Sequence, residues 1–164
     1  MNLDYTKPLS EDLIRKYQNE INWLYVSHYQ KLSESFIREF QHKVDWQLIS
    51  AYQILSEDFI REFQDKIYWR CISFYQKLNE DFIREFQNKV DWRSISFSKK
   101  LSLNFILSFK DKINWEFLLK QYGYIYCIFN DNYQIKSDNY CSDLLDFPEF
   151  LKLALRLIKL KAFQ

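Results

Sequence analysis

Tryptophan recurs in this chain at a fixed interval of 23 residues. The chain's five tryptophans are Trp23, Trp46, Trp69, Trp92 and Trp115. A leucine keeps the same interval, at Leu9, Leu32, Leu55, Leu78 and Leu101. Such a period indicates tandem copies of one supersecondary unit, and it constrains the fold more than any other feature of the sequence. Five copies span residues 9–123, between a leader of residues 1–8 and a tail of residues 124–164.

Each copy contains two apolar patterns with helical spacing. The first places four residues of the third copy at i, i+1, i+4 and i+8, on one helix face: Phe59, Ile60, Phe63 and Ile67. The second pattern is shorter and consists of Trp69, Ile72, Tyr75 and then Leu78 of the next copy. The period-2 alternation of a strand is absent. We therefore expect each copy to be a hairpin of two helices of about ten residues.

Helix-start residues and charges agree with this register. Good N-cap residues precede the first helix, at Ser10, Ser33, Ser56, Asn79 and Ser102. Others precede the second helix, at Asn22, Asp45, Asp91 and Asn114, with Tyr68 as the exception. Acid-before-base pairs four residues apart are expected within the first helix, at Glu34–Arg38, Glu57–Arg61, Glu80–Arg84, Glu39–Lys43, Glu62–Lys66 and Glu85–Lys89.

One such hairpin cannot bury its own apolar stripes, and helices this short are marginal in water. Stacked copies bury the stripes between neighbours, which is the principle of a solenoid. The predicted fold is an all-α, right-handed-type α-solenoid of five helical hairpins. We expect residues 1–164 to form one domain, with residues 124–164 as a C-terminal cap.

Composition argues against an enzyme. The chain contains one glycine, so neither a Gly-rich phosphate loop nor a nucleophile elbow is available. Its histidines and cysteines lack metal-ligand spacing, and the odd cysteine count favours free thiols in a reduced intracellular setting. No secretory signal opens the sequence, and no run approaches the roughly 20 apolar residues that span a bilayer. We predict a non-enzyme without cofactor, metal site or transmembrane segment.

The repeated phrase LSEDFIREFQ-x-K-VDW-xx-IS-x-YQ resembles the tandem repeat of proteins from giant DNA viruses that infect amoebae. The resemblance covers residues 9–123 and brings no catalytic residues with it. It implies a viral protein in the host cytoplasm, at the viral factory, or in the virion. The fifth copy departs from the phrase at Leu103, Leu107 and Leu119.

Two polar residues of the first helix recur with the period. The arginines Arg15, Arg38, Arg61 and Arg84 would form a stripe, but a glutamate one turn earlier favours a paired, solvated face over a phosphate track. The glutamines Gln18, Gln41, Gln64 and Gln87 would form either a ladder of amide hydrogen bonds or tolerated exposed positions. Both interpretations of the glutamines stay open.

Positions of the second helix that vary most between copies share one face, turned away from the Trp–Ile stripe. In a solenoid, the surface left free of packing is where partners commonly bind. We therefore predict that a partner protein contacts this face, at Tyr25, His28, Leu48, Ala51, Arg70, Phe74, Arg93 and Phe97. The alternative, that the face packs laterally within the fold, stays open.

The tail carries its own signals. The stretch YIYCIF–NDN–YQIKS predicts either a small β-hairpin or an irregular helical segment, and Pro148 suits the start of a last helix. That helix is apolar around most of its circumference, so it needs cover from its own chain or from a second copy. We expect a homodimer through Phe150, Leu151, Leu155 and Ile158.

These patterns predict a non-catalytic scaffold for protein–protein interaction in a giant-virus infection cycle. The alternative is a nucleic-acid-binding helical repeat, which a net charge of +1 disfavours. A third, weaker interpretation is a membrane-surface protein that uses the basic tail helix.

Overall fold

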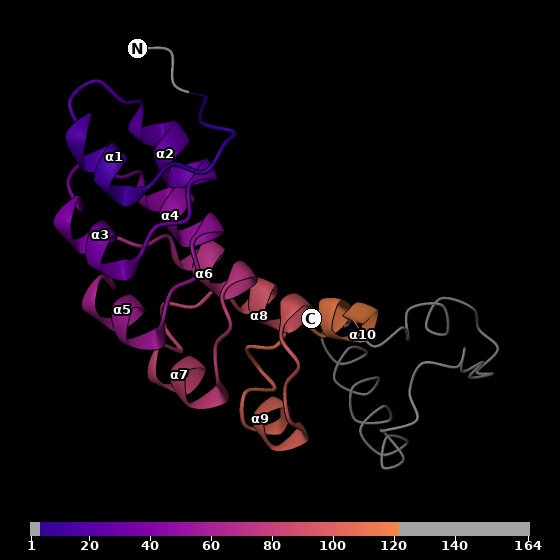
Figure 1. Cartoon of the computed structure of the whole chain (residues 1–164). Helices are drawn as coiled ribbons and strands as arrows, with labels where there is room; N and C mark the ends of the chain where they lie inside the picture. Colours follow the sequence, from indigo (N-terminus) through magenta and orange to yellow (C-terminus); the bar gives the residue numbers. More distant parts are fainter. Residues whose placement is uncertain (1–3, 122–164) are drawn as a thin grey trace. The chain divides into compact units, whose positions relative to one another are not determined.

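The computed structural model describes residues 4–121, with the backbone alone for Leu103 and residues 119–121. Within this range all regular structure is α-helical, with two helices in each copy (Figure 1). The first helices of the copies are α1 (Glu11–Lys16), α3 (Glu34–Glu39), α5 (Glu57–Glu62), α7 (Glu80–Glu85) and α9 (Leu103–Ser108). The second helices are α2 (Trp23–Tyr29), α4 (Trp46–Tyr52), α6 (Trp69–Tyr75), α8 (Trp92–Ser98) and α10 (Trp115–Gln121). The all-α repeat fold is confirmed.

The predicted caps hold the helix starts. In all five first helices, the N-cap side chain accepts a hydrogen bond from the backbone N–H three residues later. Asn22, Asp45 and Asn114 do the same for second helices, whereas Tyr68 makes no side-chain cap bond. Each satisfied cap stabilises a short helix by about 1 kcal/mol.

The helices are shorter than the apolar pattern suggested. In the third copy, α5 ends at Glu62, and Phe63 and Ile67 lie in the turn that follows. The N–H groups of Lys66 and Ile67 both donate to the Phe63 carbonyl, so this turn keeps a helix-like spacing. The apolar periodicity therefore continues past the last helical residue.

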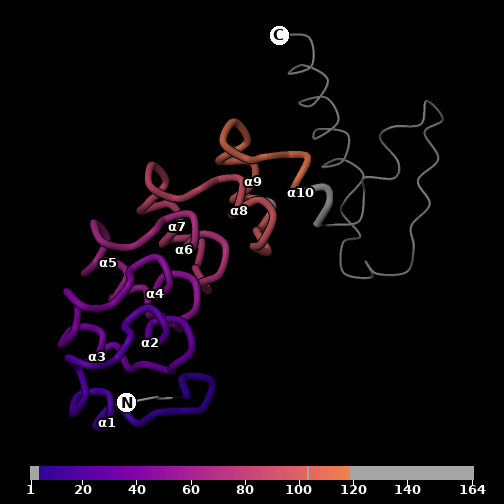
Figure 2. The backbone as a smooth tube through the Cα atoms, turned by 90° about the horizontal axis from the view of Figure 1, so that it is seen from above, coloured from indigo at the N-terminus to yellow at the C-terminus, as the bar shows by residue number. Residues whose placement is uncertain are grey.

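The first of two compact units ends at Asp91. In it, α1, α3, α5 and α7 form one layer, and α2, α4 and α6 form the other (Figures 1 and 2). The core contains one fully buried phenylalanine and one isoleucine from each of several first helices: Phe36, Ile37, Phe59, Ile60, Phe82 and Ile83. Burial of each such side chain contributes about 1.5–3 kcal/mol.

The tryptophans join one copy to the next. The Trp46 ring lies 6.4 Å from Phe59 and 5.0 Å from Phe63, both in the following copy. Trp23 and Trp69 are placed equivalently, and all three rings are half-buried. Each copy thus completes its neighbour's core, as the solenoid prediction required.

The second unit begins at Trp92. Within it, α8 packs against α10, and the Trp92 ring contacts Phe105 and Phe109. Phe105 and Leu118 are fully buried. The same pairing of a tryptophan with the next copy's phenylalanines therefore recurs here.

One predicted stripe is wrong in part. Tyr75 was assigned to the buried side of the second helix, yet 59% of its surface is exposed. Ser73 and Gln76 are buried instead, together with Ile72. The polar pair faces inward because the interior of this layer contains hydrogen-bonding partners, which are described below.

One predicted set of ion pairs is also wrong. Glu34–Arg38 and Glu57–Arg61 lie within 3.8 and 3.9 Å, as expected for contacts one turn apart. Glu39 and Lys43 do not pair, because α3 ends at Glu39 and Lys43 lies in the turn beyond it. Both residues bond to the preceding copy instead. The same correction applies to Glu62–Lys66 and Glu85–Lys89.

The predicted C-terminal cap of residues 124–164 lies outside the described residues. So do its hairpin, its last helix and the expected self-association residues Phe150, Leu151, Leu155 and Ile158.

Candidate interaction surface

A buried glutamine amide at the C-cap of α2, α4 and α6 ties three backbone groups together. Gln53 Nε2 donates to the carbonyls of Ser27 (3.0 Å) and Gln30 (2.8 Å), and its Oε1 accepts from the N–H of Leu32 (3.0 Å). Gln76 makes the equivalent bonds one copy further on. We call Gln30, Gln53 and Gln76 the glutamine ladder. Since an amide both donates and accepts, it satisfies buried N–H and C=O groups at once.

Buried serines make a second set of bonds between copies. The Oγ atoms of Ser27, Ser50 and Ser73 accept the N–H groups of Asp45, Tyr68 and Asp91, at 2.9–3.0 Å. In the second unit, Ser96 accepts from Asn114 at 2.9 Å. The bonds of Ser27 and Ser50 fix the starts of α4 and α6 against the second helices before them, and the bond of Ser96 does the same for α10 against α8.

The leader supplies the same groups to the first copy. The Tyr5 hydroxyl accepts the N–H of Asn22 at 2.8 Å, which is the role of the serine Oγ in later copies. The carbonyls of Tyr5 and Lys7 accept from Gln30 Nε2, at 2.7 and 3.1 Å. Residues 4–8 therefore stand in for a preceding copy, a role that the sequence analysis did not foresee.

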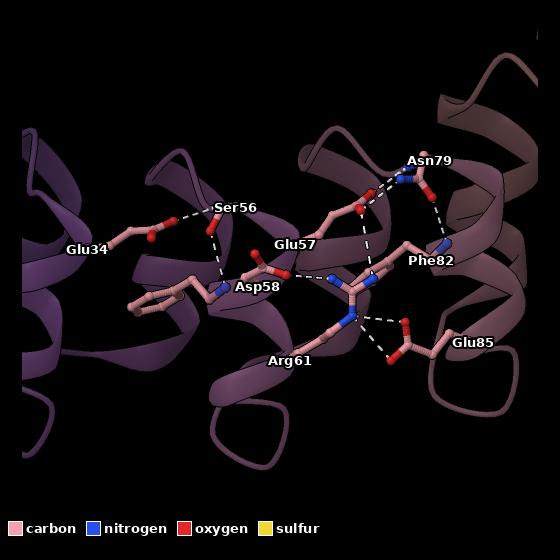
Figure 3. A network of polar contacts seen from close by, with 9 residues as sticks. Glu34, Ser56, Glu57, Asp58, Arg61, Asn79, Phe82 and Glu85 are labelled. Carbon is pink, nitrogen blue, oxygen red and sulfur yellow. Dashed lines mark hydrogen bonds and ion pairs between the residues drawn. The ribbon is translucent and has the colours of Figure 1, made fainter.

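Ion pairs repeated from copy to copy link neighbouring first helices, and Figure 3 shows the set around Arg61. Arg61 contacts Glu57 and Asp58 of its own helix, and its Nε lies 2.9 Å from Glu85 in the next copy. The pairs Arg15–Glu39 and Arg38–Glu62 repeat this link, and we call the three pairs the arginine lattice. The hydrogen bond with Glu85 is the largest cause that raises the pKa of Arg61 above its ordinary value. The arginine stripe is thus engaged by carboxylates, as expected for a paired face.

Glutamates of this layer also bond to the backbone of the next copy. Glu34 accepts the N–H of Ser56 at 2.6 Å, and Glu57 accepts that of Asn79 at 2.8 Å (Figure 3). Of the two interpretations left open for Gln18, Gln41 and Gln64, the structure does not show the ladder of amide hydrogen bonds. Each of these glutamines accepts from a lysine of the next copy: Lys43, Lys66 or Lys89.

The second helices present a different outer face. Of the predicted partner-binding residues, five are exposed: Tyr25, Arg70, Phe74, Arg93 and Phe97. The other three, His28, Leu48 and Ala51, are half-buried. Some contacts run along the face, since the His28 ring lies edge-on to Tyr29 and Tyr52, at 4.1 Å from each. In the second unit, Phe97 contacts Phe117, and the Arg93 guanidinium lies 4.6 Å over the same ring.

Three exposed tyrosines belong to this face but were not predicted there. Tyr29, Tyr52 and Tyr75 recur with the period, and more than half of each side chain is accessible. Their hydroxyl groups could have indicated this exposure from the sequence, because a tyrosine at the surface keeps its hydroxyl in water. The face is therefore more aromatic than the variable positions alone suggested.

Charges are segregated between the two layers of the first unit. Segments 23–31, 46–54 and 69–77, which contain its second helices, include no aspartate or glutamate. They do include exposed cations, at Lys31, Arg70 and Lys77. The unit's carboxylates all belong to the leader, the first helices, the turns after them, or the N-cap positions Asp45 and Asp91. The second-helix face is thus basic and aromatic.

Metal binding and membrane insertion are two further functions to weigh for the described residues. The part of the chain from 4 to 121 has no group of three His, Cys, Asp or Glu side chains that could hold a metal ion. None of its helices combines the length and apolarity needed to cross a membrane. Cys71 is a free, half-buried thiol, and burial raises its pKa.

No protein-family model matches the chain, and no curated protein or solved structure matches it either.

Proposed function

We propose that this protein is a non-catalytic helical-repeat scaffold that binds a protein partner through the outer face of its second helices. The observation that carries the proposal is the contrast between the layers. In the first-helix layer of residues 4–91, the arginines Arg15, Arg38 and Arg61 are bonded to glutamates of neighbouring copies. The second helices instead expose aromatic rings and cations, the residue types enriched at interface hot spots.

The repeat phrase supports a setting for this scaffold. Because the phrase resembles repeats of giant-virus proteins, we propose that the protein acts in the host cytoplasm, at the viral factory or in the virion. A homodimer through Phe150, Leu151, Leu155 and Ile158 belongs to the same proposal.

The test is partner capture from infected amoebae, with Phe74→Ala combined with Phe97→Ala. Both rings are exposed, at 37% and 42%, so the double variant should melt within a few degrees of the wild-type chain. We expect it to lose the captured partner. Leu107→Ala is the matched control, because Leu107 is similarly exposed (39%) but lies on a first helix. If the double variant unfolds, or captures the partner as the control does, the proposal is wrong.

A second candidate is binding of single-stranded nucleic acid, which the carboxylate-free second-helix segments favour. Basic faces with exposed rings bind single strands by pairing with phosphates and stacking on bases. Binding that weakens steeply with salt in a mobility-shift assay would support this candidate.

A further inference from the structure

We infer that the second-helix face of the first unit binds an acidic polypeptide segment that also carries aromatic or aliphatic side chains. This inference rests on the proposed function and names the chemistry of the partner. The docking surface consists of four exposed rings and two cations: Tyr29, Tyr52, Phe74, Tyr75, Arg70 and Lys77.

The cations and rings lie close enough to act together. Arg70 and Phe74 are four residues apart on α6, so their side chains project from the same side of the helix. The Phe74 ring packs against Tyr75 at 4.8 Å, and Lys77 follows directly after the C-cap Gln76. Since no carboxylate occurs in the second-helix segments of this unit, its cations attract an anionic ligand without competition from their own helix.

The third copy breaks a local rule at the same place. Tyr68 occupies the N-cap position of α6, where other copies have asparagine or aspartate, and it makes no side-chain cap bond. Loss of a cap costs about 1 kcal/mol. In exchange, the start of α6 gains a half-exposed ring two residues before Arg70 and lacks the carboxylate present at Asp45. Local rules are commonly broken at functional sites, and both changes suit an anionic, partly apolar ligand.

A polypeptide fits this surface better than a nucleic acid does. Tyr29 of the docking surface stacks on Tyr25 at 5.9 Å, and Tyr25 stacks on Tyr5 at 5.4 Å, so one face of the Tyr29 ring is already occupied. Base stacking needs free ring faces, whereas a peptide can use ring edges and hydroxyl groups.

The experiment measures fluorescence anisotropy of three labelled probes with the full chain: a glutamate–tyrosine copolymer, polyglutamate and oligothymidylate. We expect the copolymer to bind tightest. Arg70→Glu should weaken its binding by about tenfold, because one charge pair in an interface is replaced by a repulsion. The matched control is Lys16→Glu, which makes the same charge change on α1 and introduces the residue found there in the second to fourth copies. It should bind as the wild type does.

Equal losses in both variants would reduce the effect to net charge and overturn the inference. Tighter binding of oligothymidylate than of the copolymer would overturn it in favour of nucleic acid. A selection from a random peptide display library separates the inference from the proposed function. Selected peptides that are rich in Asp and Glu, and whose binding is lost in Phe74→Ala, support both the proposed function and the inference. Peptides that need Phe74 without acidic enrichment overturn the inference alone, and a selection without Phe74-dependent peptides overturns both.

Discussion

The glutamine ladder and the arginine lattice both link successive copies through residues that repeat every 23 positions. They differ in their surroundings. Gln53 is 5% exposed, whereas the side chains of Arg38 and Glu62 are 40% and 47% exposed. Buried polar groups cannot turn to water when a partner is lost, but exposed ions can. The comparison therefore predicts that the neutral ladder holds the stack more firmly than the charged lattice does.

The ladder also explains why an amide recurs at this position. Within one side chain it accepts the Leu32 N–H and donates to the Ser27 and Gln30 carbonyls. A carboxylate cannot donate these bonds and an ammonium cannot accept one. The lattice has no such requirement, because water solvates whichever charge is left over.

The largest expected effect is on the ladder. Gln53→Ala leaves one N–H and two carbonyls without their partner in the core, and each costs about 1–3 kcal/mol, so we expect a loss of at least about 3 kcal/mol. Urea unfolding of the whole chain measures it. Gln41→Ala is the control, since the side chain of half-buried Gln41 bonds only to the Lys66 ammonium within residues 4–121. A loss at Gln53 no larger than at Gln41 would show that burial of the Gln53 amide does not raise the cost of removing its bonds.

A sharper test uses the position where the ladder residue changes. Lys99, in the second unit, occupies the place of Gln30, Gln53 and Gln76 in the repeat. Burial lowers its pKa from 10.5 to about 8. Between these values the unfolded chain binds the proton that the folded chain has released, so stability rises with pH. Below pH 8 the half-buried Lys99 side chain stays charged in the folded chain, which lowers the free energy of unfolding.

Lys99→Gln should remove this dependence. We expect the variant to melt higher than the wild-type chain near neutral pH, with a difference that shrinks as the pH rises from about 8 towards 10.5. Comparing the two chains cancels the titration of the other lysines and tyrosines. A difference that stays constant over this range would mean that burial does not perturb the Lys99 ammonium.

Much of the fold could be predicted because its signals are local. The period, the two helices of each copy and the capping residues follow from spacing and side-chain chemistry within a few residues. The variable face stays a prediction as a binding site, and five of its eight residues, Phe74 among them, are exposed. Tyr75 was misplaced because a tyrosine counts as apolar in a stripe while its hydroxyl tolerates water.

The partners between copies could not be predicted in the same way. Glu62 has a base four residues later, at Lys66, and another 24 residues earlier, at Arg38, and the structure uses the second. In a repeat of 23 residues, a residue one copy away is as close as one a turn away, so charge spacing alone does not choose between them. The sequence analysis considered the glutamines Gln18, Gln41 and Gln64, which bond to lysines, and missed the buried glutamine ladder, although both sets recur with the period.

The smallest expected effect is on the lattice. Arg38 contacts Glu34 and lies 4.9 Å over the Phe59 ring, in addition to its 2.8 Å bond to Glu62. A single change at Arg38 therefore removes more than one interaction, and a double-mutant cycle with Arg38→Gln and Glu62→Gln is needed to isolate the pair. We expect a coupling of about 0.2–1 kcal/mol, as for other exposed ion pairs. The coupling energy should fall as the salt concentration is raised, because salt screens the attraction between exposed charges. A coupling energy as large as the Gln53→Ala effect, or one insensitive to salt, would show that the exposed lattice stabilises the stack as much as the buried ladder does.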